Sequence, residues 1–258
     1  MNRQYFGFEE ADKLRLALQK YDIEIVGHFV FVRMNSKGLS LFEFLGDFYE
    51  DLQHVSEVCT DRFETAQFQW AANWKVGMEN AAEGYHVPLV HPNTFGTNLS
   101  LDLDITKDCE HSRYTGKLKD KSLKWWSNVE KAIDLKPSQR YPGNGNFLIF
   151  PNIVVTFIYG SVLTFQTFDP ISINNLRINT TSWLAKNNGN AARITVLDYL
   201  KNFSEIARNE DRDICAQVQA GMRDLPNNRP VMLGELEGRI AHFQRSYMAR
   251  MDSTSKQI

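Results

Sequence analysis

The carboxy-terminal half of the chain alternates short apolar segments with turn residues and then changes to a long helical pattern. The segment NFLIFPNIVVTFIYGSVLTFQTFDP, residues 146–170, predicts two apolar strands with a turn near 159–161, and LRINTTSWLA predicts a third strand after the turn DPISINN. Helical spacing of apolar residues then extends over about 195–222, and GELEGRIAHFQRSYMARM predicts a final helix. Hairpin strands followed by a long helix indicate an α+β fold, in which a curved antiparallel sheet closes over helices.

The amino-terminal half carries further strand and helix signals. DIEIVGHFVFVRM at 22–34 is rich in β-forming residues and predicts two strands, or one strand bent at Gly27. Ser40 and Glu43 have the spacing of a capping box. One apolar stripe of a short helix follows, formed by Leu41, Phe44, Leu45, Phe48 and Leu52. FETAQFQWAANWKVGM at 63–78 predicts a strand that leads into a helix.

Two polar segments have weaker signals. The basic stretch at 117–136 predicts a helix, and its Trp125 and Trp126 either dock an acidic redox partner or form the buried aromatic face of a solvated helix. GNGN at 143–146 predicts a turn, because no helix opens after it to bind phosphate.

Length and composition are those of an ordinary soluble globular protein. With 258 residues, 43% of them hydrophobic and 23% charged, the chain is one large domain or one domain with an appended segment. The net charge of −2 gives no reason to expect nucleic acid binding. No run of eighteen apolar residues is present, and the start of the chain lacks a signal-peptide pattern, so we expect neither membrane insertion nor secretion.

The three cysteines, Cys59, Cys109 and Cys215, are far apart and odd in number. This usage suits a reducing cytoplasm, and we expect Cys215 to be a small core residue rather than a reactive thiol. Three cysteines cannot supply the four thiolates of most iron–sulfur clusters, and the chain lacks the paired Cys-x-His and Cys-x-x-His steps of a Rieske centre. An iron–sulfur cluster held within these residues is therefore excluded.

The segment ENAAEGYHVPLVHP, residues 79–92, places His86 and His91 five positions apart with Pro88 between them. On an ideal helix such positions lie about 140° apart around the axis, too far to bind one ion. We expect Pro88 to end or distort the helix after Val87, so that His91 swings back toward His86. Two neutral imidazoles suit a divalent transition metal with at least one further ligand, although two histidines bonded to backbone groups would have the same spacing.

The residues around these histidines form an extended pattern. NWK at 73–75, EN at 79–80, Glu83, and then YH and HP resemble, without gaps, the iron-binding segment of Rieske non-haem iron oxygenases, the aromatic-ring-hydroxylating family. FPN at 150–152, NEDRDICAQVQAG and EGRIAHF resemble a later strand, the third-ligand helix and the terminal helix of the same alpha-subunit catalytic domain. The resemblance covers about the last four-fifths of the chain.

In this family a carboxylate from the long carboxy-terminal helix completes the iron site. RNEDRDIC offers Glu210, Asp211 and Asp213, and the family pattern nominates Asp211. Helix geometry gives modest support, because Asp211 shares a face with Cys215 and Val218 that we expect to look inward, whereas Asp213 lies about 200° away.

The resemblance therefore implies mononuclear Fe(II) on His86, His91 and Asp211. Two imidazoles and one carboxylate leave up to three coordination positions open for oxygen and an organic substrate. Glu83 is expected to hold His86 by its other nitrogen where electrons enter, and Asn80 to line the site near the iron. These are the two expected catalytic residues. Tyr85 is expected to point the other way and pack.

The same resemblance implies a helix-grip (START/Bet v 1-like) fold and its division along the chain. Residues 1–20 match only a connector, 21–252 form the catalytic domain, and 253–258 form a flexible tail. The apolar strands at 146–168 are expected walls of a hydrophobic substrate cavity. Because the family's Rieske domain is missing from this sequence, a [2Fe–2S] cluster is expected only on a partner chain, a Rieske or ferredoxin-type electron donor in trans, and a homotrimer is compatible with such transfer.

The function expected from the resemblance is hydroxylation of an aromatic or other small hydrophobic substrate with O₂, by mono- or dioxygenation, as in cytoplasmic catabolism of aromatic compounds. A non-redox module of the same family, which binds a hydrophobic ligand in the same cavity, is the alternative from another class. A zinc hydrolase on the same ligands is a weaker alternative, because no general base is apparent.

Overall fold

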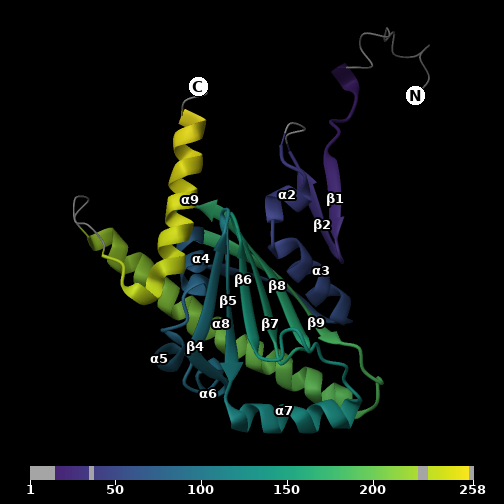
Figure 1. Ribbon diagram of the computed structural model, residues 1–258. Helices are drawn as coiled ribbons and strands as arrows, with labels where there is room; N and C mark the ends of the chain where they lie inside the picture. Colours follow the sequence, from purple (N-terminus) through teal and green to yellow (C-terminus); the bar gives the residue numbers. More distant parts are fainter. Residues whose placement is uncertain (1–14, 35–37, 226–231, 256–258) are drawn as a thin grey trace, which may run out of the picture.

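The chain forms a curled sheet of seven antiparallel strands with long helices against it (Figure 1). The computed structural model describes residues 15–34, 38–225 and 232–255. The strands lie in the order β3-β9-β8-β7-β6-β5-β4. Their bounds are β3 Cys59–Trp70, β4 Leu99–Asp108, β5 His111–Leu118, β6 Asn144–Ile149, β7 Ile153–Ile158, β8 Val162–Ser172 and β9 Asn175–Ala185. The α+β fold expected from the sequence is confirmed.

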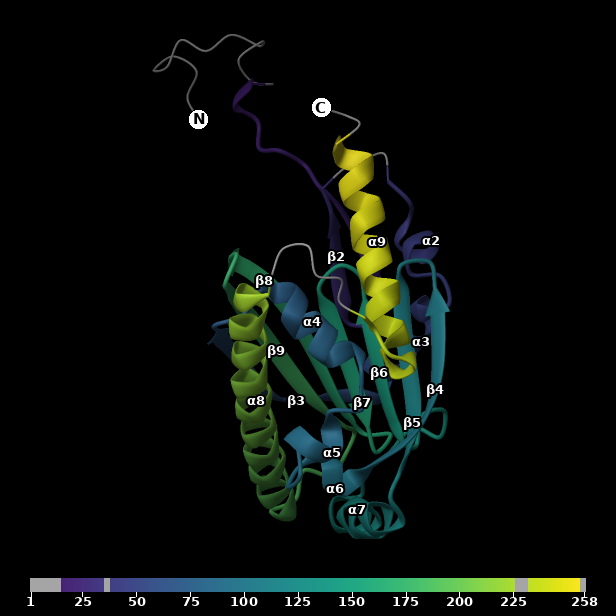
Figure 2. The ribbon, with the colours of Figure 1, turned by 90° about the vertical axis from the view of Figure 1, so that its left-hand side faces the viewer.

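The helices divide between the two faces of this sheet, as Figure 2 shows from the side. Helices α4, α8 and α9 cover one face, with the short α5 and α6 beside them, and α7 lies below the sheet. Their bounds are α4 Trp74–Ala82, α5 Val87–Val90, α6 Phe95–Asn98, α7 Asp120–Ile133, α8 Ala192–Asp224 and α9 Gly238–Ser255. The 3₁₀ turn η2, Glu235–Glu237, leads directly into α9. In α7, Trp126 is buried whereas Trp125 is 39% exposed, so only one indole is fully in the core.

The amino-terminal region packs on the other face. Strands β1, Asp22–Val26, and β2, Phe29–Arg33, form a hairpin that turns at Gly27, whose φ of 55° favours glycine. The predicted capping box of Ser40 and Glu43 opens α2, Leu41–Leu45. The predicted apolar stripe continues into a separate helix, α3, Phe48–Val58, because the chain turns between them at Gly46 with a φ of 53°. The expected single short helix is thus two helices.

The apolar segment before residue 170 holds three strands, β6, β7 and β8, rather than the predicted two. The predicted first strand is divided at Pro151, which lies in the turn between β6 and β7. A proline has no N–H to donate to a neighbouring strand, so it interrupts the strand. The predicted turn at 159–161 is present between β7 and β8. GNGN, predicted as a turn, instead enters the sheet, where Asn144 pairs with Ile158 at the start of β6.

Helix α8 packs along the covered face of the sheet, but its inward stripe is rotated from the predicted one. Cys215 is buried as expected, whereas Val218 is 44% exposed and Gln219 is buried in its place. A hydrogen bond accompanies this rotation: Gln219 Oε1 accepts the backbone N–H of Asn73 at 2.7 Å, which ties this side of α8 to the start of α4. Over the described ranges, none of the helices combines the length and the apolar character needed to cross a membrane.

Candidate metal centre

The histidine segment is a pair of short helical turns between α4 and β4. Helix α4 is capped by Asn73, whose side chain accepts the backbone N–H of Lys75 at 3.0 Å, and it ends at Ala82, before either histidine. His86 and His91 flank α5 as its first and last caps. The predicted break after Val87 is therefore wrong: Pro88 lies in the first turn of α5, where a missing N–H leaves no hydrogen bond unmade.

One turn of helix brings the two imidazoles together, with ring centroids 5.2 Å apart. The backbone N–H of His91 donates to the Val87 carbonyl at 3.0 Å, which closes that turn. The next turn is closed on His91 as well, since Gly96 donates to the His91 carbonyl at 2.8 Å. A Cβ on Gly96 would lie 2.6 Å from that same oxygen, so this close approach requires glycine.

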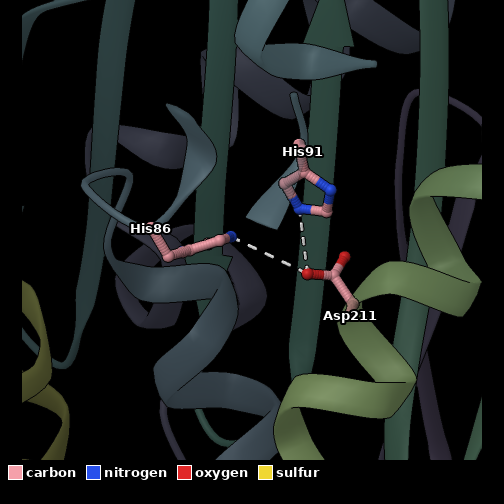
Figure 3. A group of neighbouring side chains, drawn as sticks. All are labelled: His86, His91 and Asp211. Carbon is pink, nitrogen blue, oxygen red and sulfur yellow. Dashed lines mark ion pairs between the residues drawn. The ribbon is translucent and has the colours of Figure 1, made fainter. Parts of the chain in front are cut away.

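Asp211, on the middle of α8, reaches between the two rings (Figure 3). Its Oδ1 lies 3.0 Å from His91 Nε2 and 3.7 Å from His86 Nε2. One donor atom from each of the three residues lies within 4.8 Å of the others. The structure thus brings together the three residues that the sequence nominated, while Asp213 points away, with 63% of its side chain exposed and Arg212 beside it.

A carboxylate holds the other nitrogen of each ring. Glu83 accepts from His86 Nδ1 and, at 3.1 Å, from the His86 backbone N–H. Glu210 Oε2 lies 2.8 Å from His91 Nδ1 and accepts the Thr94 hydroxyl at the same distance. Such partners fix the tautomer with hydrogen on Nδ1 and turn each Nε2 lone pair toward the common point. Sequence reasoning missed the contact of Glu210 with His91, and its only signal was the acidic pair beside Asp211.

Two further residues named from the sequence have defined positions. Asn80 Nδ2 donates to Asp211 Oδ1 at 2.9 Å, so this amide orients the shared carboxylate oxygen. Tyr85 does not line the space beside the histidines. It is 42% exposed, and its hydroxyl donates to Glu237 at 3.0 Å instead of packing in the core as expected.

The pKa values of His91 and Cys215 are both raised, which favours the charged form of the imidazole and the neutral form of the thiol. Burial lowers the pKa of His91, but hydrogen bonds and charges from Asp211 and Glu210 outweigh it, so the pKa of His91 is raised. Burial raises the pKa of the Cys215 thiol, and the charge of Asp211 adds to this effect. Cys215 is therefore a neutral core thiol, as the sequence suggested.

The donor set fits a divalent transition metal. Two ligand atoms that each lie about 2.1 Å from one ion are about 3.0 Å apart at a right angle and about 3.6 Å apart at 120°. The two distances from Asp211 Oδ1, 3.0 Å and 3.7 Å, match these separations. Two imidazoles with one carboxylate, and no thiolate, are the ligands of non-haem ferrous sites.

Two adjoining cavities, each of about 120 Å³, open between this group and the sheet. Both are lined by Asp211 and Arg208 from α8, Phe95 from α6, and Thr156 and Gln166 from β7 and β8. The strands expected as cavity walls therefore do line the space beside the histidines.

The fold and this site define a class of proteins. The family described as "Ring hydroxylating alpha subunit (catalytic domain)" matches residues 50–253. The chain belongs to this family of Rieske non-haem iron oxygenases, as its sequence resemblance indicated.

Curated relatives carry oxygenase names. The chain is 23% identical over 218 residues to the carnitine monooxygenase oxygenase subunit of Acinetobacter pittii, an alignment that covers 83% of this chain and 56% of that protein. It is 36% identical over 96 residues to the anthranilate 1,2-dioxygenase large subunit of Acinetobacter baylyi, over 34% of this chain and 20% of that protein. The chain thus spans about half the length of the first relative and a fifth of the second.

Solved structures share the fold. The quaternary ammonium Rieske monooxygenase CntA in complex with an inhibitor superimposes with a TM-score of 0.74 at 18% identity, over 97% of this chain and 66% of that chain. Naphthalene 1,2-dioxygenase from Rhodococcus sp. bound to indole gives a TM-score of 0.59 at 13% identity, over 88% of this chain and 65% of that chain. The curved sheet and long helix are those of a Rieske oxygenase catalytic domain.

Proposed function

We propose that the chain is the catalytic domain of a Rieske-type oxygenase and that His86, His91 and Asp211 hold a mononuclear ferrous ion. One observation carries this proposal: Asp211 Oδ1 faces the Nε2 atoms of both rings, at 3.0 Å and 3.7 Å, while carboxylates hold both Nδ1 atoms. Bound Fe(II) would supply open coordination positions at which O₂ is activated beside an organic substrate, for mono- or dioxygenation.

The protein residues have separate roles in this proposal. Glu83 and Glu210 orient the imidazoles with the proton on Nδ1, which leaves each Nε2 free to bind a metal. Asn80 fixes the rotamer of Asp211 through its hydrogen bond to Oδ1. Phe95, Val154 and Phe168 limit the access of water to the space beside the rings.

Electrons for turnover come, in this proposal, from a [2Fe–2S] Rieske cluster on a partner chain. The sequence has three cysteines, fewer than the four thiolates of most iron–sulfur clusters, and it lacks the paired Cys-x-His and Cys-x-x-His steps of a Rieske centre. The donor would be a Rieske or ferredoxin-type protein, with Glu83 and His86 as the point of entry, and a homotrimer would place such a donor beside the site. We assign the catalytic domain to residues 21–252. Most of the connector expected at 1–20 lies outside the described residues, and 253–255, expected as part of the tail, continue α9.

Metal analysis of protein purified without air tests the iron site. We expect about one iron per chain, and nearly complete loss of iron in His86→Ala and Asp211→Ala. Asp213→Ala is the matched control, because Asp213 lies on the same helix but faces solvent. Iron retained in Asp211→Ala would contradict the proposal, and iron-free protein that binds aromatic ligands would favour the ligand-binding module instead.

A second experiment tests turnover. Iron-loaded chain, mixed with a small organic substrate, a reduced Rieske protein and O₂, should form hydroxylated product, and none should form when the Rieske protein is left out. Product formation in Glu83→Gln at an unchanged rate would remove Glu83 from the route of electron entry.

A further inference from the structure

The wall that the sheet presents to the cavity is mixed: Val154 and Phe168 are apolar, but several other side chains are polar. Strands β5 to β8 contribute side chains with hydrogen-bonding groups, which are Tyr114, Asn144, Asn146, Thr156 and Gln166. A buried polar group without a partner costs about 1–3 kcal/mol, so a pocket built for a plain hydrocarbon would avoid such groups. The wall therefore offers groups that a polar ligand can satisfy.

Asn144, at the start of β6, shows this most directly. It is 4% exposed, and its Oδ1 is buried and has no hydrogen-bond partner in the described part of the chain. Its Nδ2 has one long hydrogen bond, 3.5 Å to the hydroxyl of Tyr114, which is 8% exposed. A primary amide has two donors and an acceptor oxygen, so most of this capacity is unused. Both side chains line the cavity beside the histidines.

A second pair of polar side chains, Arg208 on α8 and Gln166 on β8, lines both cavities. The terminal nitrogens of Arg208 bind Glu64, with Nη2 3.1 Å from Oε1, but its Nε is buried without a partner among the described residues. Gln166, in β8, lines both cavities with it and makes no hydrogen bond to the described chain through its side chain. Arg208 is one helical turn from Asp211, so this pair adjoins the proposed iron ligands.

We infer that the cavity selects a small polar substrate with two hydrogen-bonding groups: a hydroxyl or amino donor for Asn144, and a carbonyl or carboxylate acceptor for Arg208 and Gln166. This inference rests on the proposed function and narrows the substrate class, which the sequence indicated only as aromatic or hydrophobic. Asn144 and Gln166 are then specificity-determining residues. Unsubstituted hydrocarbons bind poorly, because they leave these groups desolvated and unpaired.

Matched probes test this selection. The full chain is titrated by ligand-observed NMR with an aromatic pair, toluene and 3-hydroxybenzoate, and an aliphatic pair, pentane and 4-hydroxybutanoate. In at least one pair we expect the polar probe to bind about tenfold more tightly or better, which corresponds to one or two net hydrogen bonds. Equal or tighter binding of the hydrocarbon in both pairs, or no binding of either polar probe, overturns the inference.

Variants locate the selection in the chain. Asn144→Leu and Gln166→Leu are each expected to reduce the preference for the polar probe several-fold, and thermal melting shows whether each is folded. Thr180→Val is the matched control, because the Thr180 hydroxyl is also buried without a partner among described residues but lies outside both cavities. A preference that survives in both leucine variants overturns the inference.

Metal content measured on the same samples separates this inference from the proposed function. A chain without iron that still prefers the polar probe contradicts only the iron site. A chain with iron that prefers the hydrocarbon contradicts only the polar substrate.

Discussion

The two histidines of the site are held in different ways. His86 takes its carboxylate from Glu83, three residues earlier in the same connecting segment. His91 takes its carboxylate from Glu210, 119 residues later on α8, and shares it with Thr94. His91 is also more buried, with 2% of its side chain exposed against 14% for His86.

The two contacts differ in whether they need only local structure or the packing of the whole fold. The contact between Glu83 and His86 needs only the turn between α4 and α5, so it forms within one short stretch of sequence. The contact between Glu210 and His91 forms only when α8 packs against the histidine segment. We therefore expect His91 to link the site to the stability of the fold, and His86 to affect the site alone.

The largest expected effect comes from removing each carboxylate in turn. Glu83→Ala and Glu210→Ala should each weaken iron binding by about 10- to 100-fold, as loss of such partners does in metal sites. Only Glu210→Ala should also lower the free energy of unfolding of the metal-free chain, by about 1–3 kcal/mol, because it leaves buried groups of Thr94 and His91 without a partner. The His86 groups that Glu83→Ala leaves are closer to water, since the His86 side chain is 14% exposed. Metal titration and chemical denaturation measure the two quantities, and equal stability losses would remove the distinction.

A similar effect on stability, but a smaller one on iron binding, is expected from methyl groups added beside the two histidines. In Gly96→Ala the new Cβ would meet the His91 carbonyl oxygen at 2.6 Å, and this backbone atom cannot move away without shifting the turn. In Gly84→Ala the new Cβ would meet the Leu103 side chain at 3.2 Å, and a side-chain tip can adjust. We expect a loss of about 1–3 kcal/mol for Gly96→Ala and clearly less for Gly84→Ala.

Denaturation curves of both glycine variants provide the measurement, with iron titration as the second readout. Gly96→Ala should also weaken iron binding, since the turn positions His91. A larger stability loss in Gly84→Ala would show that the His86 side is the more rigid one.

The smallest effect concerns His111, an imidazole held by backbone groups. Its Nε2 donates to the Phe44 carbonyl at 2.7 Å and its Nδ1 accepts the Phe150 N–H at 3.0 Å, so the ring is neutral. Burial lowers its pKa and outweighs the favourable Phe44 carbonyl and nearby carboxylates. The unfolded chain therefore takes up a proton as the pH falls below about 6.5, where the folded chain does not.

This uptake makes folding less favourable in acid. The contribution of His111 is fully present above its ordinary pKa and is lost as the pH falls, by at most about 1.4 kcal/mol per pH unit. Denaturation at pH 8 and pH 5.5 measures it, and His111→Gln should flatten the difference. An unchanged pH dependence in that variant would show that other groups, such as His54 and His242, account for it.

Local features are the ones that the sequence predicts well. The capping box at Ser40, the hairpin turn at Gly27 and the helix over α8 all follow from short-range patterns, and the structure confirms them. The approach of His86, His91 and Asp211 also follows from the family pattern, and the side chains do converge.

The predictions that fail depend on packing or on an ambiguous residue. Pro88 is compatible with the end of a helix but equally with the first turn of a new one, and only the position of α4 decides between them. Helical spacing predicts that Val218 faces inward, whereas Gln219 is buried in its place and is bonded to Asn73 on another element. The contact between Glu210 and His91 needs that same packing, so no local pattern specifies it.

Arg239, at the start of α9, connects the carboxy-terminal helix to the end of α4, beside the histidine segment. The residue is 1% exposed, and burial lowers its pKa to about 10. Its guanidinium donates to Ser112 in β5, to Asn146 in β6, and, at 3.0 Å, to the carbonyl of Ala82, the residue before Glu83. Loss of the chain from residue 238 onward, by proteolysis or a frameshift, would remove Arg239 and its hydrogen bond to the end of α4. Damage near the carboxy terminus would therefore disturb the position of Glu83 and of the His86 ring that it holds.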